Sequence, residues 1–382
     1  MYDVVVIGAG PVGATLALAL ADADLKLFLV DSRPRGEAGR SERTLALSHG
    51  ARLIFERVGV WAPLAATRDA VTAIVEVDVS QAQGFGATRL TAADARVPAL
   101  GYVVSYRALQ AALDAALAHR GIEVRFQAAA ERVGGTPAYA ALTLQHGTDA
   151  ITARLAVVAD GVAANVAGIE RARHPYDQTA IVAKVWPRRH HDGVAYERFT
   201  PQGPIALLPQ NDHYGLVWTR PPADVPGTLA LSDAAFLDAL AEHFGTRVSF
   251  ARVAERRAFP LALELARPIA TTRVVTIGNA AQALHPIAGQ GFNLGLRDAF
   301  ELAQVVIDTP RDAIGARDML DRYVRERRTD RWAGIAFTHG LVQFFAGDLA
   351  VLRWPRGIAL TALDAFPQAR RVFARAMLFG LR

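Results

Sequence analysis

Residues 2–13, YDVVVIGAGPVG, decide the fold of this 382-residue chain. Residues 2–7 read as a short apolar strand of the kind that lies buried in a parallel sheet, and residues 12–23 read as a helix rich in alanine and leucine. Between them the glycines have the spacing G-x-G-x-x-G. The first glycine makes a tight turn, the second lets the backbone approach a pyrophosphate, and the third lets the helix pack closely on the strand. We therefore predict a Rossmann-type dinucleotide site with the diphosphate at the helix N-terminus. The predicted contacts are Gly8, Gly10, Pro11 and Gly13.

The next apolar run ends in an acidic residue. Residues 25–30 read as the second buried strand, and Asp31 follows directly. Its carboxylate can accept hydrogen bonds from a ribose 2′-OH, as dinucleotide sites require. The alternative, a glycine-rich turn without a ligand, explains the flanking strand and helix less well.

Composition excludes several kinds of chemistry. The chain has no cysteine, so disulfides, thiolate catalysis and cysteine-held metal or iron–sulfur sites are excluded, and a cytoplasmic protein is expected. The net charge is +5 and comes almost wholly from arginine, which a GC-rich genome explains as well as a function does. No nucleic-acid-binding signature is present. No stretch is apolar for long enough to predict a transmembrane helix.

The order of the elements predicts an α/β fold with an α+β second lobe. Short β runs around one helix fill residues 172–265, and residues 273–277 return to the buried-strand pattern. We expect a Rossmann-like cofactor domain, an inserted substrate domain on an antiparallel sheet, and a helical C-terminal region. The predicted bounds are 1–75, 100–170 and 270–315 for the cofactor domain, 76–99 and 171–269 for the substrate domain, and 316–382 for the helical region.

A second glycine-rich turn favours FAD over a nicotinamide cofactor. The segment 278–293, GNAAQALHPIAGQGFN, follows a buried strand and leads into a helix. Such a turn can place Asn279, next to Gly278, beside a ribityl chain. It can also aim the N-terminus of the following helix at the flavin edge where the reduced ring carries negative charge. A nicotinamide enzyme does not need this second anchor.

At this point a family resemblance becomes specific. The run from Gly278 to Asp298 resembles the second FAD motif of the flavin aromatic hydroxylases, the class A monooxygenases of the p-hydroxybenzoate hydroxylase fold. Within that family the chain resembles the ubiquinone-biosynthesis branch, and the 2-octaprenyl-6-methoxyphenol hydroxylases are its most similar group. Four further segments carry the likeness, so it covers nearly the whole chain. They are RTLALS at 43–48, ADG at 159–161, YERFT at 196–200 and YVRERRTDR at 323–331.

The resemblance implies an enzyme that uses FAD, NAD(P)H and O2 to hydroxylate an aromatic ring through a flavin C4a-hydroperoxide. In this chemistry the cofactor carries the difficult step, and the protein orients the ring and excludes water. The implied flavin-ring and oxygen loop comprises Pro286, Gly289, Gln290 and Gly291. Further implied cofactor contacts are Arg43, Arg107, Asp160, Gly161, Phe292 and Asn293. The chain departs from the family at Asn279, where aspartate is usual, and at Ala164 and Ala167, where serine and arginine are usual.

Several side chains allow either a functional or a structural interpretation. His285 is a candidate general base, but a histidine that packs the turn is the favoured alternative. Glu197 and Arg198 are candidate substrate contacts or a strand-surface ion pair. Phe199 and Trp218 are candidate walls of an aromatic pocket or plain core. No base for the phenol is identifiable, and water is the alternative. The pair at 190–191, HH, lacks a third ligand nearby, so no metal site is predicted.

The C-terminal segment 341–382 alternates apolar residues with arginine. Such a surface suits an anionic membrane, or it covers the core and exposes a basic face. The resemblance favours peripheral contact with the inner face of the cytoplasmic membrane, a polyprenylated phenol substrate of the 2-polyprenyl-6-methoxyphenol type, and other ubiquinone-biosynthesis proteins as partners. Two alternatives stay open: a hydroxylase of a small soluble aromatic compound, and a non-catalytic FAD-holding subunit of a biosynthetic complex.

Overall fold

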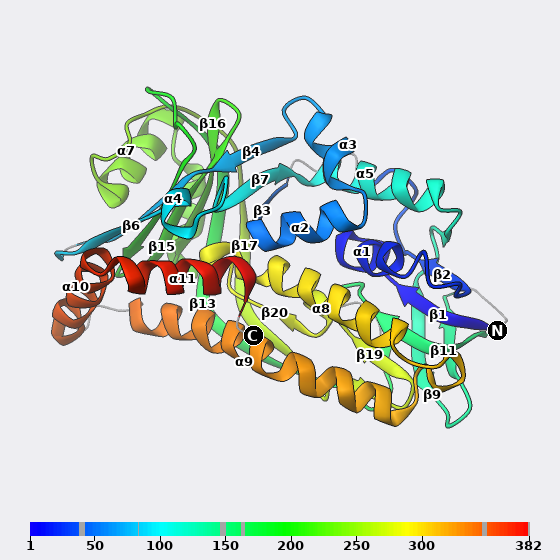
Figure 1. Ribbon diagram of the computed structural model, residues 1–382. Coiled ribbons are helices and arrows are strands. Elements are labelled where there is room, and N and C mark those ends of the chain that lie inside the picture. Colours follow the sequence, from blue (N-terminus) through cyan, green and yellow to red (C-terminus); the bar gives the residue numbers. More distant parts are fainter. Residues whose placement is uncertain (38–42, 83, 146–149, 162–164, 346–349, 381–382) are drawn as a thin grey trace.

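The computed structural model describes residues 1–37, 43–82, 84–145, 150–161, 165–345 and 350–380. Within these residues the chain forms a mixed α/β structure with three sheets and a helical C-terminal region (Figure 1). The predicted fold class is therefore confirmed. Ala164 lies outside the described residues.

The first sheet has nine strands and is centred on β1. Parallel neighbours flank β1 on both sides, with Val4 opposite Leu27 on β2 and Leu155 on β11. Alternate side chains of these strands fall into two separate core clusters, so both faces of the sheet are covered. In order across the sheet the strands are β12 (Asn165–Val166), β9 (Ala130–Gly135), β10 (Ala140–Leu144), β11 (Ile151–Val158), β1 (Tyr2–Ile7), β2 (Leu27–Val30) and β8 (Glu123–Arg125), with β19 (Val274–Thr276) beside β11 and β18 (Ala270–Thr271) beside β19.

Three helices cover one face of this sheet. They are α1 (Pro11–Ala19), α5 (Tyr106–His119) and α8 (Gln290–Ile307). α1 is shorter than the predicted helix at 12–23, while α5 begins one residue after Ser105, whose hydroxyl accepts the N–H of Ala108 and caps the helix. α1 packs on both of the others, and this brings the two glycine-rich turns to the same end of the sheet.

The second sheet has eight strands and is antiparallel except where β14 pairs with β5. In order its strands are β20 (Gln282–Ala283), β17 (Phe250–Arg267), β13 (Glu170–Pro187), β16 (His213–Arg220), β15 (Gly203–Gln210), β14 (Val194–Thr200), β5 (Glu76–Gln81) and β6 (Ala87–Thr91). One face packs on α7 (Asp233–Phe244), and α6 (Val225–Ala230) follows β16. Apart from β20, each strand lies in a stretch of sequence that contributes to only one of the two large sheets. The division of the chain into two domains stays a prediction.

A small third sheet joins the two large ones. Its strands are β3 (Thr44–Ser48), β7 (Gly101–Ser105) and β4 (Val71–Ile74). Three short helices lie near it: α2 (His49–Arg57), α3 (Trp61–Ala66) and α4 (Ala92–Ala95). Because β4 leads straight into β5, this sheet connects the cofactor end of the molecule to the second sheet.

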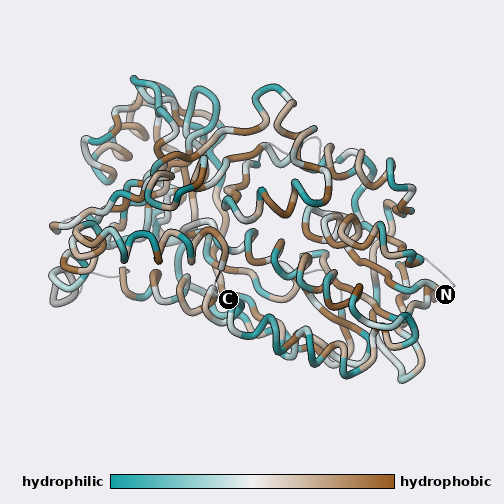
Figure 2. The backbone as a smooth tube through the Cα atoms, in the orientation of Figure 1, coloured by the Kyte–Doolittle hydropathy of each residue, from teal (hydrophilic) through white to brown (hydrophobic). Residues whose placement is uncertain are grey.

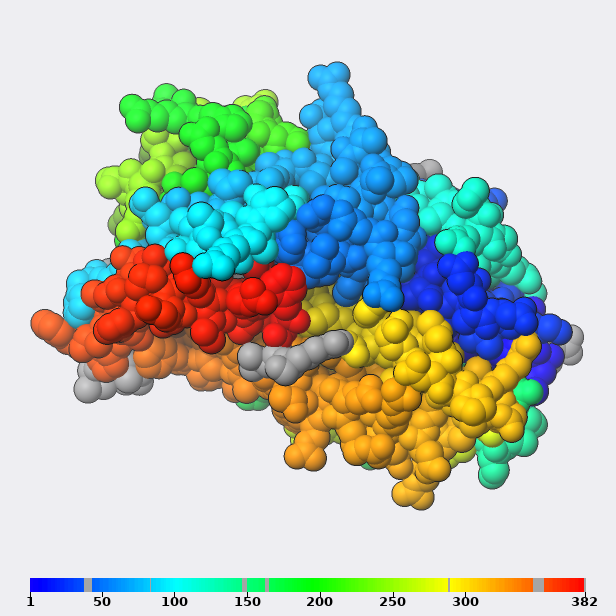
Figure 3. Space-filling view, in the orientation of Figure 1, coloured from blue at the N-terminus to red at the C-terminus, as the bar shows by residue number. Residues whose placement is uncertain are grey.

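Three helices close the C-terminal part of the chain. They are α9 (Arg317–Phe345), α10 (Ala350–Ala365) and α11 (Pro367–Phe379). Figure 2 shows much of α9 as hydrophilic where it runs along one edge of the molecule. Figure 3 shows α11 lying over the face between α9 and the region of β6 and α4. None of the helices in the described ranges is both long and apolar enough to span a bilayer.

Candidate active site

The first glycine-rich turn is held by close backbone packing. Gly8 has φ +101°, and a Cβ there would lie 2.7 Å from the backbone of Ala159 and Asp160. A Cβ on Gly13 would lie 2.0 Å from the carbonyl oxygen of Gly8. At Gly10, by contrast, the nearest atom would be an Arg33 nitrogen at 3.9 Å, so the space beside the helix N-terminus is open. No side chain caps α1, whose first N–H groups can therefore bind an anion.

Asp31 organises the end of β2. Its carboxylate accepts the N–H of Ala9 at 2.8 Å and both the backbone N–H and the guanidinium of Arg33. Burial opposes ionisation of Asp31, but these donors outweigh it and hold its pKa below the usual value. Asp31 is therefore charged and fixes the turn, and its contact with a ribose stays a prediction. Arg33 was not predicted, although its position two residues after Asp31 is the signal that could have found it.

The second turn lies directly against the first. Gly278 opens a 3₁₀ turn, Gly278–Ala280, and a Cβ there would touch Val12 at 3.1 Å. A Cβ on Gly295 of α8 would lie 2.9 Å from the Cα of Gly278. Asn279 is exposed beside these contacts. The structure thus brings both predicted cofactor turns, which are 265 residues apart in sequence, into one site.

Further predicted cofactor residues surround this place. Asp160 and Gly161 follow β11, and the Cα of Asp160 lies beside Gly8. The Arg43 guanidinium lies over the Tyr106 ring at 4.3 Å, and the Tyr106 hydroxyl accepts a hydrogen bond from Arg33 at 3.0 Å. Arg107 is exposed in the first turn of α5. Arg43 thus connects through Tyr106 and Arg33 to the Asp31 end of the site, whereas Asp160 lies on the other side of β1, beside Gly8.

Asn293 ties the loop before α8 to the third sheet. Its side-chain oxygen accepts the N–H of Ser48 at 2.8 Å, and its nitrogen donates to the carbonyls of Ala46 at 3.1 Å and Gly289 at 2.7 Å. Gly289 has φ +59° and precedes α8, which has no side-chain cap. Because three backbone groups occupy the Asn293 amide, its role is to position the loop. Phe292 packs against the main core.

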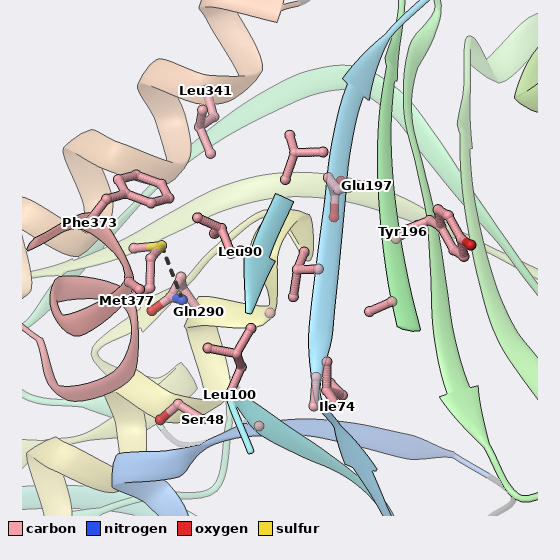
Figure 4. A pocket seen from close by; sticks show the side chains of 18 of the residues that line it. Ser48, Ile74, Leu90, Leu100, Tyr196, Glu197, Gln290, Leu341, Phe373 and Met377 are labelled. Atoms are coloured by element: carbon pink, nitrogen blue, oxygen red, sulfur yellow. Dashed lines mark hydrogen bonds between the residues drawn. The ribbon is translucent and has the colours of Figure 1, made fainter. Parts of the chain in front are cut away.

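A large apolar cavity begins at this loop. Its volume is about 400 Å³, and it lies between the second sheet and the C-terminal helices. Figure 4 shows Ile74, Leu90, Leu100, Leu341 and Phe373 around it, with Gln290 beside Met377. The loop contributes Pro286, Gly289, Gln290 and Asn293. The C-terminal helices contribute Phe337, Leu341, Phe344, Phe345, Ala359, Leu360, Leu363, Phe373, Ala374, Met377 and Leu378. The cavity therefore extends from the predicted flavin loop to the tail of the chain.

Comparisons with known proteins agree with this geometry. Residues 1–338 match the family described as "FAD binding domain". The chain belongs to this FAD-binding family. It is 33% identical to the ubiquinone hydroxylase UbiL of Rhodospirillum rubrum, over 98% of this chain and 88% of that protein. It is 29% identical to the 3-demethoxyubiquinol 3-hydroxylase of Escherichia coli, over 95% of this chain and 94% of that protein.

The fold is shared with solved flavoenzymes. The p-nitrophenol 4-monooxygenase PnpA of Pseudomonas putida superposes with a TM-score of 0.81 at 17% identity, over 100% of this chain and 99% of that chain. Family membership and hydroxylase relatives together confirm the predicted class, an FAD-dependent aromatic monooxygenase.

The residues present fit FAD. The open space at Gly10 and the uncapped start of α1 suit its diphosphate, because a Cβ would fill that space and a capping side chain would occupy the N–H groups. The uncapped start of α8 lies beside the cavity and suits the negatively charged edge of the reduced ring. Two chain segments thus provide separate anion-binding helix ends for one elongated cofactor.

His285 lies behind the loop and does not line the cavity. Its Nδ1 accepts the N–H of Ile287 at 3.2 Å, so its Nε2 carries the proton and donates to Gln178 Oε1 at 3.2 Å. The side chain is 1% exposed, and burial lowers its pKa to about 4. A neutral imidazole with both nitrogens engaged supports the packing role, and we do not propose it as the general base.

A buried ionic network holds the second turn from behind. Asp298 of α8 accepts the N–H of Gly278, the Gln282 amide and the guanidinium of Arg327. Arg327 also donates to Asp330, which binds Arg297 as well. Burial opposes ionisation of Asp330, but Arg297 and Arg327 hold its pKa below the usual value. Through this network the 323–331 segment of α9 supports the second glycine-rich turn from behind. The sequence resemblance alone did not indicate this role.

Two of the four predicted substrate residues line the cavity. Glu197 and Phe199 alternate with Arg198 along β14, so they face the cavity and Arg198 faces the other side. Phe199 stacks on Phe345 of α9 at 3.8 Å between ring centroids.

Arg198 and Trp218 do not line the cavity. Arg198 donates to Ser80 on the face of the sheet away from the cavity. Trp218 packs on Phe236 of α7 and belongs to the core there. The strand register determines both outcomes, because a shift of one residue reverses the face. The described residues contain no cluster of His, Asp and Glu side chains that could hold a metal ion.

Proposed function

We propose that this flavoprotein hydroxylates the aromatic ring of a polyprenylated phenol of the 2-polyprenyl-6-methoxyphenol type in ubiquinone biosynthesis. The apolar cavity is the observation that carries the proposal. It runs from the flavin loop to three C-terminal helices and is walled mainly by aliphatic and aromatic side chains. A prenyl tail needs such a surface, whereas a small soluble phenol needs a compact polar pocket. The names of the two hydroxylase relatives support the same pathway.

The chain's own residues would orient the ring and exclude water. When bound and reduced by NAD(P)H, FAD would supply the O2 activation that hydroxylation of an electron-rich ring requires. Pro286 and Gln290 stand at the loop end of the cavity, where they would border the flavin ring. The first-turn N–H groups of α8 would stabilise negative charge at its edge. The Phe199–Phe345 stack and the helices behind it would keep solvent from the reacting atoms.

We also propose that α10 and α11 contact an anionic membrane surface. Residues 350–382 contain six arginines and one aspartate, while residues 1–349 contain 36 basic and 36 acidic residues. The net charge of +5 therefore resides in this segment. Among its described side chains, Trp354, Ile358, Phe366 and Val372 are large, apolar and 58–70% exposed. A basic surface with apolar anchors suits a bilayer. Internal contacts use part of this charge, since Arg356 donates to the carbonyl of Phe344 and Arg370 pairs with Asp94.

One experiment tests the activity. The purified protein is examined for a flavin spectrum, then given 2-farnesyl-6-methoxyphenol with NADH or NADPH in air, and the product is analysed by mass spectrometry. A product one oxygen atom heavier supports the proposal. Turnover of soluble phenols only would favour a hydroxylase of small soluble aromatic compounds. A flavin whose spectrum changes with no phenol and no nicotinamide donor would favour a non-catalytic subunit.

A separate experiment tests the membrane contact. Sedimentation with vesicles that contain anionic lipid is compared with sedimentation with neutral vesicles.

A further inference from the structure

Met377 brings a sulfur atom to the loop end of the cavity. It lies near the end of α11 and lines the cavity, and the Gln290 amide nitrogen contacts its sulfur at 3.8 Å (Figure 4). Gln290 is the first residue of α8 and directly follows the loop that is predicted to border the flavin ring. The thioether therefore stands at the predicted flavin end of the cavity, although it belongs to the C-terminal segment.

Sulfur is the most easily oxidised atom of this wall. The chain has no cysteine, and the cavity lining within the described residues includes no tryptophan or histidine. Tyr196 is the one tyrosine in that lining, and its ring packs on Tyr214 and Phe244 on the opposite face of the sheet. The lone pair of a thioether takes up oxygen to form a sulfoxide, whereas aliphatic side chains and phenylalanine rings resist oxidation under the same conditions.

The other two methionines of the chain have different surroundings. Met1 is 67% exposed and does not line the cavity. Met319 is 4% exposed, and its sulfur accepts the N–H of Gly315 at 3.3 Å. An oxidant in bulk solution would therefore reach Met1 first, whereas an oxidant formed inside the cavity would reach Met377 first. The order of oxidation along one chain thus reports where the oxidant forms.

We propose that Met377 is a site of self-oxidation, which becomes the sulfoxide when the reduced enzyme meets O2 with no phenol in the cavity. The balance is that of ring hydroxylation with sulfur in place of the ring. NAD(P)H supplies two electrons and the sulfur supplies two. One oxygen atom of O2 bonds to sulfur, and the other leaves as water with the hydride and one proton from solvent. This inference rests on the proposed function, which places the reacting oxygen beside Gln290.

The oxidised side chain has a hydrogen-bond donor within reach. The Gln290 amide that now contacts a weak sulfur acceptor can donate to the stronger sulfoxide oxygen. The sulfoxide adds a polar group to an apolar wall, so a prenylated phenol should bind about two- to tenfold more weakly afterwards. A bound phenol occupies the cavity and takes up the oxygen itself. Met377 therefore records turnover without substrate, and a methionine sulfoxide reductase would reverse the change.

Peptide mass spectrometry tests the proposal, because trypsin separates the three methionines. Cleavage after lysine and arginine places Met1 in residues 1–26, Met319 in 318–322 and Met377 in 376–382. The FAD-loaded protein is reduced with dithionite and re-oxidised with air in repeated cycles, with catalase present to remove free peroxide. Dithionite makes the result independent of the choice between NADH and NADPH. Without a phenol, peptide 376–382 should gain one oxygen atom at least about tenfold more often than peptide 1–26. Addition of 2-farnesyl-6-methoxyphenol should suppress this gain.

Met377→Leu is the matched variant, because leucine keeps the wall apolar and removes the sulfur. Cycling without a phenol should weaken later binding of the phenol to the wild type, as measured from the flavin spectrum, and should not alter its binding to Met377→Leu. Greater oxidation of Met1 than of Met377, or an unmodified Met377 after cycles that consume O2, would overturn the self-oxidation while hydroxylation of the phenol still upheld the proposed function. A protein that binds no flavin would overturn both.

Discussion

The two glycine-rich turns hold the same cofactor site by different means. The first turn is fixed by contact between backbones, with Gly8 and Gly13 allowing approaches that any Cβ would block. The second is fixed by side chains from far along the chain, namely Asn293 against the third sheet and Asp298 against Arg327. The first turn depends on glycines, which have no side chain, and the second turn depends on buried hydrogen bonds and an ion pair. They should therefore fail differently when they are mutated.

Substitution in the first turn should have the largest effect. In Gly13→Ala the new Cβ would lie 2.0 Å from the Gly8 carbonyl oxygen, so the turn or α1 must move. We expect loss of bound flavin and a fall in stability of about 3 kcal/mol or more. Flavin content and urea unfolding measure both. Gly227→Ala is the control, because nothing lies within 4 Å of its Cβ. A Gly13→Ala protein that binds flavin and has wild-type stability would contradict the claim that close backbone contact fixes the first turn.

In the second turn, the buried ion pair should matter next. Arg327→Ala leaves Asp298 and Asp330 buried without this partner, which should cost about 3–5 kcal/mol at saturating FAD. Arg322→Ala removes exposed pairs with Glu326 and Asp308 and should cost less than about 1 kcal/mol. Chemical denaturation of both variants beside the wild type checks the difference. Equal losses would show that the network does not support the turn.

Acid should weaken the second turn through His285. Its folded-state pKa of about 4 lies below the ordinary value, so the unfolded chain binds the proton more readily as the pH falls from about 6.5 toward 4. This stabilisation is complete above that range, and about 2 kcal/mol should be lost by pH 5. His285→Asn keeps an acceptor for Ile287 but cannot take up the proton, and it should flatten the dependence of stability on pH. Parallel pH profiles for the two proteins would refute this assignment.

The smallest effect on the protein itself should come from Gly10→Ala. Its Cβ would meet only the Arg33 guanidinium, at 3.9 Å, so the apoprotein should unfold within about 0.5 kcal/mol of the wild type. The methyl group would nevertheless occupy the space of the diphosphate, and FAD affinity should fall about tenfold or more. Flavin titration of the apoprotein measures the change. Unaltered affinity would place the diphosphate elsewhere.

The sequence predicted the first turn more completely than the second because the first is local. Its glycines act on neighbours within six residues or on adjacent strands, and the strand–turn–helix order is visible in residues 2–23. The roles of Asn293, Asp298 and Arg327 depend on partners that come together only in the folded chain. The sequence also did not show which face of each strand in the second sheet lines the cavity, and this is why Trp218 was placed in the pocket. A change of one position in register exchanges such assignments.

The placement of the cavity has an evolutionary consequence. The matched family region ends at residue 338, yet ten of the residues that wall the cavity lie beyond it, from Leu341 to Leu378. None of them belongs to the two glycine-rich turns that are predicted to hold FAD. Mutations in this last segment can therefore enlarge, shorten or reshape the binding space while the oxygen-activating machinery stays intact. The segment after residue 338 is thus the part of the cavity wall that can change with the least effect on the two glycine-rich turns.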